Sequence, residues 1–177
     1  VDLVVRAETA PLEAAEVRSA LTDFYVVLPT LGDVFSAEVF ADVATPRCRL
    51  LAYFGVGFNH IDVAAARTAG VAVTNTPGAV TDATADIAVM LMLMSARRAG
   101  EGERMVRAGA WPGWYPTQML GLHMSGKCVG IVGLGRIGQE IARRCHFGFG
   151  MEVHYVSRSE KSLAFPVTRA PDLEALA

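Results

Sequence analysis

A strand of small and β-branched residues that runs directly into regularly spaced glycines is the feature that most constrains this chain. Residues 129–132 form an apolar run of strand length, followed by Gly133, Gly135 and Gly138 in a Gly-x-Gly-x-x-Gly pattern, and residues 139–145 continue at helical spacing. In such a unit one glycine permits the tight turn, one lets the backbone approach a pyrophosphate, and one lets the helix pack on the strand. The pattern therefore predicts a dinucleotide site, with an ordinary βα turn as the alternative.

The second strand of this unit ends without a carboxylate. Residues 151–156 alternate between apolar and polar side chains, as a strand does, and Ser157, Arg158 and Ser159 follow. A site that prefers NAD carries Asp or Glu about 20 residues past the glycines, where it accepts from the ribose 2′-hydroxyl. Arg158 can instead pair with a 2′-phosphate and both serines can donate to it, each charge-assisted bond contributing about 1.5–3 kcal/mol. The sequence therefore favours NADP over NAD. The alternative is that residues 157–159 form only a solvated turn, and Glu160 leaves NAD as a second candidate cofactor.

Composition limits the classes of partner. A net charge of −2 gives no electrostatic reason to expect nucleic acid or an anionic membrane surface. The longest apolar run, residues 87–94, is too short to span a bilayer. Cys48, Cys128 and Cys145 are widely spaced and are expected to be small buried side chains, and no histidine has the partner that a metal site requires. No signal peptide is visible, so we expect a cytoplasmic protein. From the histidines and cysteines we expect no metal site.

The chain divides near residue 80. Strands are expected at residues 1–5, 24–28, 49–54 and 71–74, with helices at 11–21, 37–43 and 62–69. Alternating strands and helices predict a parallel sheet covered on both faces. A helix at residues 83–98 is apolar all round, so burial on every face, between two domains, is expected. Only two clear strands follow it, and residues 172–176 begin a further helix.

Two loops add to this picture. Gly55-Val56-Gly57 follows directly on a strand end, where open α/β sheets place their ligands. Closely spaced glycines leave backbone amides exposed, and a small carboxylate can bind to them, although an ordinary glycine-rich turn is the alternative. Trp111 and Trp114 lie in a stretch rich in Pro and Gly, which is typical of an arm anchored on another surface.

Five motifs in order carry a family resemblance: Phe54-Gly55-Val56-Gly57-Phe58-Asn59-His60-Ile61-Asp62, Val73-Thr74-Asn75-Thr76-Pro77-Gly78, Thr81-Asp82-Ala83-Thr84-Ala85-Asp86, the Trp111–Trp114 arm and the glycine pattern. Over nearly its whole length the chain resembles the D-isomer-specific 2-hydroxyacid dehydrogenases, most closely the glyoxylate/hydroxypyruvate reductase branch. The resemblance implies an α/β fold with a flavodoxin-like substrate (catalytic) domain portion at residues 1–80. An interdomain helix at 81–98 and the first half of a Rossmann dinucleotide-binding domain at 99–177 would follow. Residues 99–123 would be an arm that forms a homodimer.

The resemblance also implies the binding residues. The substrate carboxylate would be bound by Gly55, Val56 and Gly57. The cofactor, NADP or alternatively NAD, would be bound by Thr84 near the nicotinamide, by Gly133, Gly135, Arg136, Ile137 and Gly138 at the pyrophosphate, and by Ser157, Arg158 and Ser159 at the adenosine ribose. Gln118 falls where some relatives place an aromatic side chain over the substrate, which leaves the substrate open among small 2-keto or 2-hydroxy acids.

Reduction of a 2-keto acid needs, besides a hydride, a general acid and a cation that polarises the carbonyl. In the family these are a His, an Arg and a Glu downstream of the second Rossmann strand, so we expect no catalytic residue in this chain and interpret it as an internal fragment. His60 is expected to support the substrate loop through a hydrogen bond.

Two other functions are alternatives. The chain could be a nucleotide-sensing interaction module of the same fold, although Val56 and Gly57 favour the enzyme. It could also be a degenerate product, which Tyr25 and Tyr53 mildly support.

Overall fold

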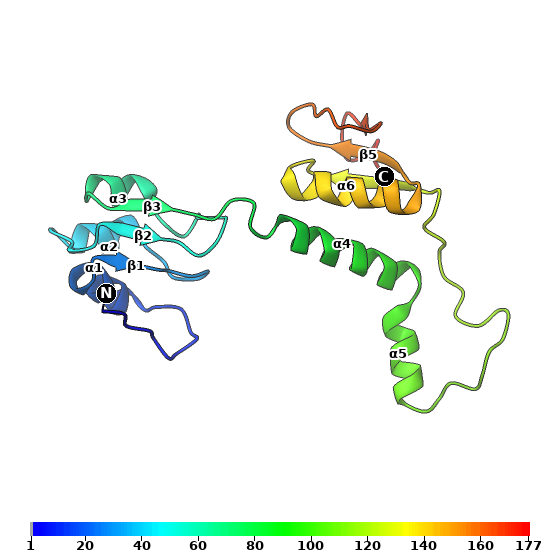
Figure 1. Ribbon diagram of the computed structural model, residues 1–177, viewed down its shortest axis with the longest axis horizontal. Helices are drawn as coiled ribbons and strands as arrows, with labels where there is room; N and C mark the ends of the chain where they lie inside the picture. Colours follow the sequence, from blue (N-terminus) through cyan, green and yellow to red (C-terminus); the bar gives the residue numbers. More distant parts are fainter. Residues whose placement is uncertain (1) are drawn as a thin grey trace. The chain divides into compact units, whose positions relative to one another are not determined.

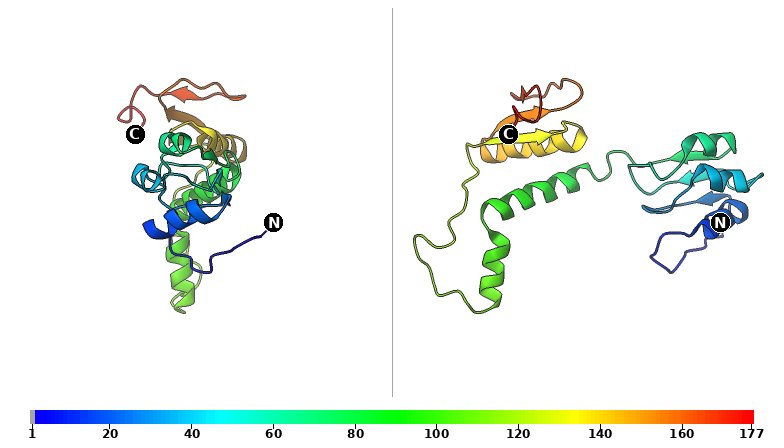
Figure 2. Two further views of the ribbon diagram at one scale, coloured as in Figure 1. Left: turned by 90° about the vertical axis from the view of Figure 1, so that its left-hand side faces the viewer. Right: turned by 180° about the vertical axis from the view of Figure 1, so that it is seen from behind.

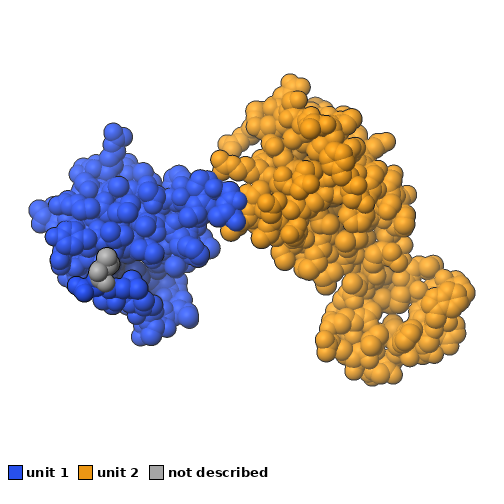
Figure 3. Space-filling model, viewed as in Figure 1, with its two compact units in different colours: residues 1–79 blue, residues 80–177 orange. Residues whose placement is uncertain are grey.

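The chain folds into α/β units, as Figure 1 shows for the computed structural model, which describes residues 2–177. Residues 1–79 form unit 1 and residues 80–177 form unit 2 (Figure 3). Each unit has its own three-stranded sheet and its own hydrophobic core. All strand pairs in both sheets are parallel, so the predicted α/β class with parallel strands is confirmed.

Unit 1 is a small parallel sheet with short helices. Its elements are α1 (Ala14–Asp23), β1 (Val26–Val27), α2 (Ala37–Asp42), β2 (Leu50–Ala52), α3 (Val63–Thr68) and β3 (Ala72–Thr74), with strand order β1-β2-β3. The helix starts follow from local capping, since the Asp62 carboxylate accepts from the Ala65 amide at 2.8 Å where α3 begins. Gly70, at φ 74°, ends that helix in the left-handed conformation that glycine tolerates. Leu21, Phe35 and Leu51 are fully buried in the core.

The strand predicted at residues 1–5 is wrong. Val1 lies outside the described residues, and residues 2–9 have no regular secondary structure. Leu3, Val4 and Val5 are 78%, 68% and 77% exposed. Strand propensity describes how well a side chain fits a pleated, half-buried surface, and no described strand pairs with this segment.

Unit 2 contains the longer helices. Its elements are α4 (Thr81–Ala96), α5 (Ala99–Arg107), β4 (Cys128–Val132), α6 (Arg136–Phe149), β5 (Glu152–Val156) and β6 (Thr168–Arg169), with strand order β4-β5-β6. Figure 2 shows α4 beside α6, and the two helices make the most extensive helix–helix contact of this unit. Side chains of α4, including Val89 and Leu93, pack on the core that the sheet and α6 form.

Two elements of unit 2 were missed. β6 exists because His154 and Tyr155 of β5 pair with Thr168 and Arg169, so the described sheet has one strand more after the long helix than predicted. α5 lies inside the segment interpreted only as an arm. Residues 172–176 form turns instead of the predicted helix.

Within unit 2 the long apolar helix is covered on one side, so its burial on every face, between two domains, stays a prediction. Ala85 is the buried residue of α4, whereas Ile87 and Leu91 are 52% and 55% exposed. Packing on α6 covers one side of α4, and the rest of unit 2 leaves the opposite side uncovered. An exposed apolar helix face of this kind marks a surface for association.

The cysteines also differ from the expectation. Cys48 and Cys145 are buried, and burial raises the pKa of both thiols, but Cys128 at the start of β4 is exposed.

Candidate functional site

The glycine fingerprint, residues 133–138, connects β4 to α6. Gly133 has φ 97°, and its amide donates to the Val156 carbonyl at 2.8 Å, which ties the turn to β5. A Cβ on Gly138 would lie 2.2 Å from the Gly133 carbonyl oxygen, closer than real Cβ contacts allow. The first glycine therefore serves the turn and the last one serves close packing of the helix on it.

The fingerprint has free donors, and two of its carbonyls are engaged by Gln139. The Gln139 amide donates to the Gly135 carbonyl at 2.9 Å, and the Gln139 side chain donates to the Leu134 carbonyl at 3.2 Å. Within residues 2–177 the amides of Gly135, Arg136 and Ile137 donate to no acceptor. Because a helix N-terminus carries partial positive charge, these amides fit an anion.

Space at the fingerprint also fits a bound phosphate. A Cβ built on Gly135 would meet nothing within 4 Å, so the backbone faces open space there. The described residues thus fit the pyrophosphate of a dinucleotide: free amides at the first turn of α6, no side chain in front of them, and carbonyls directed elsewhere.

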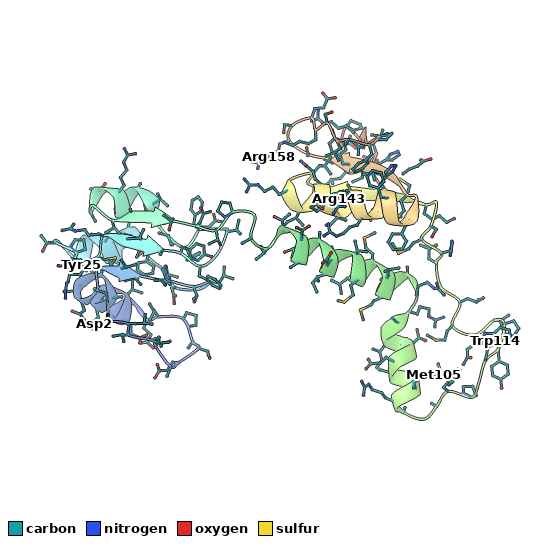
Figure 4. All side chains as sticks on the ribbon, in the orientation of Figure 1. Asp2, Tyr25, Met105, Trp114, Arg143 and Arg158 are labelled. Atoms are coloured by element: carbon teal, nitrogen blue, oxygen red, sulfur yellow. The ribbon has the colours of Figure 1, made fainter. Side chains whose placement is uncertain are left out.

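The ribose turn, residues 157–159, follows β5. Figures 1 and 2 place the loop after β5 at the same end of unit 2 as the N-terminus of α6, and Figure 4 labels Arg158 there. The Ser157 hydroxyl donates to the Ser159 carbonyl, and Arg169 Nη2 donates to the Ser157 carbonyl at 3.0 Å. The Ser157 hydroxyl is thus engaged within the turn, and the expectation that both serines donate to a phosphate stays a prediction. Sequence reasoning did not single out Arg169, because β6 was not expected.

Thr84 lies in the first turn of α4. Its hydroxyl donates to the Val80 carbonyl at 2.7 Å, so the donor is used within the helix. This end of α4 is held to α6 by Arg144, which donates to Asp82 at 2.9 Å and to Asp86 at 2.7 Å. The hydrogen bonds to Asp82 and Asp86 raise the pKa of the Arg144 guanidinium further above its usual value.

The carboxylate loop, residues 55–57, belongs to unit 1 and follows the end of β2. The Gly55 carbonyl accepts from the Thr76 amide at 2.8 Å and from the Thr76 hydroxyl at 3.1 Å. The Val56 carbonyl accepts from Asn75 Nδ2 at 2.9 Å. The segment after β3 thus holds the Gly55 and Val56 carbonyls, while the Val56 and Gly57 amides donate to nothing within the described chain, so the loop presents free donors.

Asn75 and Thr76 hold the candidate loop, although the sequence analysis quoted them in a motif without giving them a role. Their contacts join segments 19 and 21 residues apart, and no local spacing signals such a contact.

A buried tyrosine and a half-buried histidine lie beside the carboxylate loop. The Tyr53 side chain is 1% exposed, and a Cβ on Gly55 would lie 2.2 Å from its hydroxyl oxygen. The rings of Tyr53 and His60 meet edge to face with centroids 4.8 Å apart. Tyr53 Oη and His60 Nε2 are buried without a hydrogen-bond partner, so the predicted supporting hydrogen bond from the His60 side chain is wrong. His60 supports the loop by packing instead.

Residues 2–177 contain neither a metal-binding cluster nor a helix that could span a membrane. No group of three or more His, Cys, Asp or Glu side chains is arranged to bind a metal ion. None of the described helices combines the length and the apolar character needed to cross a membrane.

Comparison with known proteins identifies the family of the second half of the chain. Residues 89–177 match the sequence profile of the D-isomer specific 2-hydroxyacid dehydrogenase, NAD binding domain.

Relatives with curated names match over most of the chain. It is 46% identical over 143 residues to a glyoxylate reductase of Thermococcus kodakarensis, covering 78% of this chain and 42% of that protein. It is 38% identical over 154 residues to a glycerate dehydrogenase of Hyphomicrobium methylovorum, covering 87% and 47%. The chain thus spans less than half the length of these relatives.

A solved structure gives the same result. The crystal structure of a glyoxylate reductase from Paecilomyes thermophila is similar with a TM-score of 0.73 and 32% identity, covering 93% of this chain and 51% of that one. The profile match over half of the chain, together with the predicted motifs, leads to one conclusion: the chain belongs to the D-isomer-specific 2-hydroxyacid dehydrogenase family.

Proposed function

We propose that this chain supplies the cofactor-binding and carboxylate-binding parts of an NADP-dependent oxidoreductase that reduces a small 2-keto acid, glyoxylate or hydroxypyruvate, to the 2-hydroxy acid. One observation carries the proposal: the chain holds two sets of free backbone amides, each directly after a parallel strand. Those of Gly135 to Ile137 suit a pyrophosphate, and those of Val56 and Gly57 suit a carboxylate. The names of the relatives, glyoxylate reductase and glycerate dehydrogenase, agree with such a substrate.

The chain's residues bind and orient in this proposal. When bound, the nicotinamide supplies the hydride that reduces the carbonyl carbon. Gly133, Gly135 and Gly138 shape the turn on which the pyrophosphate rests, with Arg136 and Ile137 offering amides. Thr84 Oγ1 donates to Val80 and so has lone-pair capacity left to accept from a carboxamide group.

Substrate orientation is assigned to the carboxylate loop. Gly55 gives the loop room above Tyr53, while Val56 and Gly57 donate to the carboxylate. We assign proton donation to no residue of the described chain. Residues 1–80 are proposed as a substrate-domain portion, 81–98 as an interdomain helix and 99–177 as the nucleotide-binding portion.

The preference for NADP rests on the ribose turn. Arg158 is exposed, whereas a carboxylate at this place would repel a 2′-phosphate. We expect Arg158→Gln to weaken NADPH binding roughly tenfold and NADH binding less than twofold, since one charge-assisted bond is lost. Fluorescence titration of the purified chain with both dinucleotides tests this. Tighter binding of NADH than of NADPH by the unmodified chain would contradict the preference.

The activity is tested separately by following NADPH oxidation with glyoxylate and with hydroxypyruvate, first with this chain. The proposal predicts dinucleotide binding without turnover here, and turnover when the chain is part of a full-length enzyme. Turnover by this chain alone would show that a general acid lies within it and would bring His60 back into consideration.

Self-association is proposed through the arm, residues 99–123. Its apolar side chains are exposed, among them Trp111 at 55%, Trp114 at 77% and Leu120 at 65%, and Figure 4 labels Trp114 on the arm. Aromatic side chains of this kind are enriched in protein interfaces. Light scattering should give a dimer mass, and Trp114→Ser should shift the equilibrium towards the monomer by about tenfold or more. A monomer at high micromolar concentration would contradict the proposal.

We also propose a cytoplasmic location, and we propose that neither nucleic acid nor an anionic membrane is a partner, because a net charge of −2 attracts neither. Binding of labelled DNA or of anionic vesicles at physiological salt would contradict it.

A further inference from the structure

A second arginine lies at the ribose turn. Arg169 is in β6, in register with Tyr155 of β5, and the strands are parallel. Their carboxyl ends therefore lie at the same edge of the sheet, where β5 continues into the ribose turn. From this place Arg169 Nη2 reaches the Ser157 carbonyl oxygen at 3.0 Å.

The charge of this arginine is not compensated. Among the ion pairs of residues 2–177, none includes Arg158 or Arg169. Both side chains are exposed, and the contact with Ser157 is the one hydrogen bond that the Arg169 side chain makes within the described chain. Residues 157–169 also contain Lys161 against the single carboxylate of Glu160, so this edge is positive.

We infer that Arg169 is a second cation for the adenosine 2′-phosphate of NADP and acts together with Arg158; the inference rests on the proposed cofactor preference. A 2′-phosphate carries a charge of about −1.5 to −2 at neutral pH, more than one guanidinium neutralises. The bond to Ser157 holds one nitrogen of Arg169, and the remaining donors of its planar fork are free for phosphate oxygens. Arg158 of the ribose turn and Arg169 of the adjacent strand β6 would thus approach the phosphate together.

The experiment compares Arg169→Gln, Arg158→Gln and the double variant with the unmodified chain. The ligands are NADPH, NADH, adenosine 2′,5′-bisphosphate and adenosine 5′-monophosphate, titrated by calorimetry. We expect Arg169→Gln to weaken the binding of NADPH and of the bisphosphate roughly tenfold. The binding of NADH and of the monophosphate should weaken less than twofold. The double variant should bind NADH at least as tightly as NADPH. Arg67→Gln, an exposed arginine of α3 outside any described ion pair, is the matched control and should change nothing.

Each outcome tests either the role of Arg169 or the preference for NADP on which that role rests. An equal loss for both dinucleotides in Arg169→Gln would mean that the arginine only holds the turn through Ser157, and would overturn the inference. A selective effect of Arg158→Gln with none of Arg169→Gln would overturn it too, while leaving the proposed preference for NADP intact. If the unmodified chain binds the monophosphate as tightly as the bisphosphate, the proposed preference itself fails. A thermal melt of each variant checks folding, and Arg169→Lys should recover part of the NADPH affinity because it keeps the charge.

Discussion

The carboxylate loop and the glycine fingerprint both present free backbone amides, but different contacts hold these amides in place. Both follow a parallel strand, and both present amides without intramolecular acceptors. In the fingerprint the following helix supplies the free amides, and Gly138 fits against a backbone carbonyl. In the carboxylate loop no helix follows at once; Asn75 and Thr76 hold the carbonyls, and Gly55 fits against the side chain of Tyr53.

This difference separates a candidate anion site held by its own segment from one that depends on a distant segment. The fingerprint is held by its glycines and by Gln139 just after them, so it can be recognised along the sequence. The carboxylate loop depends on residues from a distant segment, so single side-chain changes should affect it more selectively. The two sites should therefore respond differently to mutation.

The largest effect is expected for Gly138→Ala. The added Cβ would lie 2.2 Å from the Gly133 carbonyl oxygen, so helix and turn must separate. We expect a loss of about 1–3 kcal/mol in the free energy of unfolding and of most dinucleotide affinity. Urea unfolding and NADPH titration measure both.

Gly148→Ala is the control for that change, because it is in the same helix and its Cβ would meet nothing within 4 Å. It should stabilise the protein by about 0.5–1 kcal/mol, as alanine does in a helix. Equal behaviour of the two variants would remove the packing argument for Gly138.

Gly55→Ala should be destabilising as well, by about 1–3 kcal/mol, because its Cβ would collide with the tip of the Tyr53 ring. Here the obstacle is a side chain, so Tyr53→Leu combined with Gly55→Ala should recover part of the loss. No second-site change of a side chain should rescue Gly138→Ala. Unfolding measurements on the single and double variants test the distinction, and additive losses would contradict it.

Asn75→Ala should act on the carboxylate loop alone. The substitution leaves the Val56 carbonyl without its hydrogen-bond donor, which should lower the free energy of unfolding by about 1–2 kcal/mol. The loop can then change its orientation. We expect the affinity for oxamate, a carboxylate analogue of a small 2-keto acid, to fall roughly tenfold, with NADPH affinity unchanged. Asn59→Ala, an exposed asparagine just after the loop, is the control. A parallel loss of NADPH affinity would show that Asn75 acts on the whole fold.

The smallest effect is expected for Tyr53→Phe. The Tyr53 hydroxyl is buried without a partner, and removing it should stabilise the protein by about 1 kcal/mol. A rise in the thermal midpoint of a few degrees would agree with this value. Destabilisation would mean that the hydroxyl has a partner in solution, such as a buried water.

The sequence was most informative where one segment determines its own structure. The strand and helix around the fingerprint and the strand at β5 were predicted because hydrophobic spacing and glycine chemistry are local. The α/β class followed from the alternation of such segments.

Prediction failed where a segment depends on a partner. Leu3, Val4 and Val5 have a high propensity for strands, but no strand lies beside them. The two residues of β6 form too short a segment to indicate a strand by themselves, yet they pair with β5. α4 showed an apolar surface, but spacing alone could not tell which side α6 would cover.

At the sites the same rule applies. The glycines were found from the sequence. Three side-chain hydrogen bonds were not, because they depend on side-chain directions that only the fold supplies: those of Ser157 to Ser159, Asn75 to Val56 and Arg169 to Ser157.

The donors of the carboxylate loop have a consequence for proton chemistry. Val56 and Gly57 would hold the substrate through peptide N–H groups, which neither gain nor lose a proton across the physiological range. Recognition built in this way has the same strength in mildly acidic and mildly alkaline solution, and it ranks anions by shape more than by basicity. Any change with pH in how tightly a keto acid binds must then come from groups other than this loop.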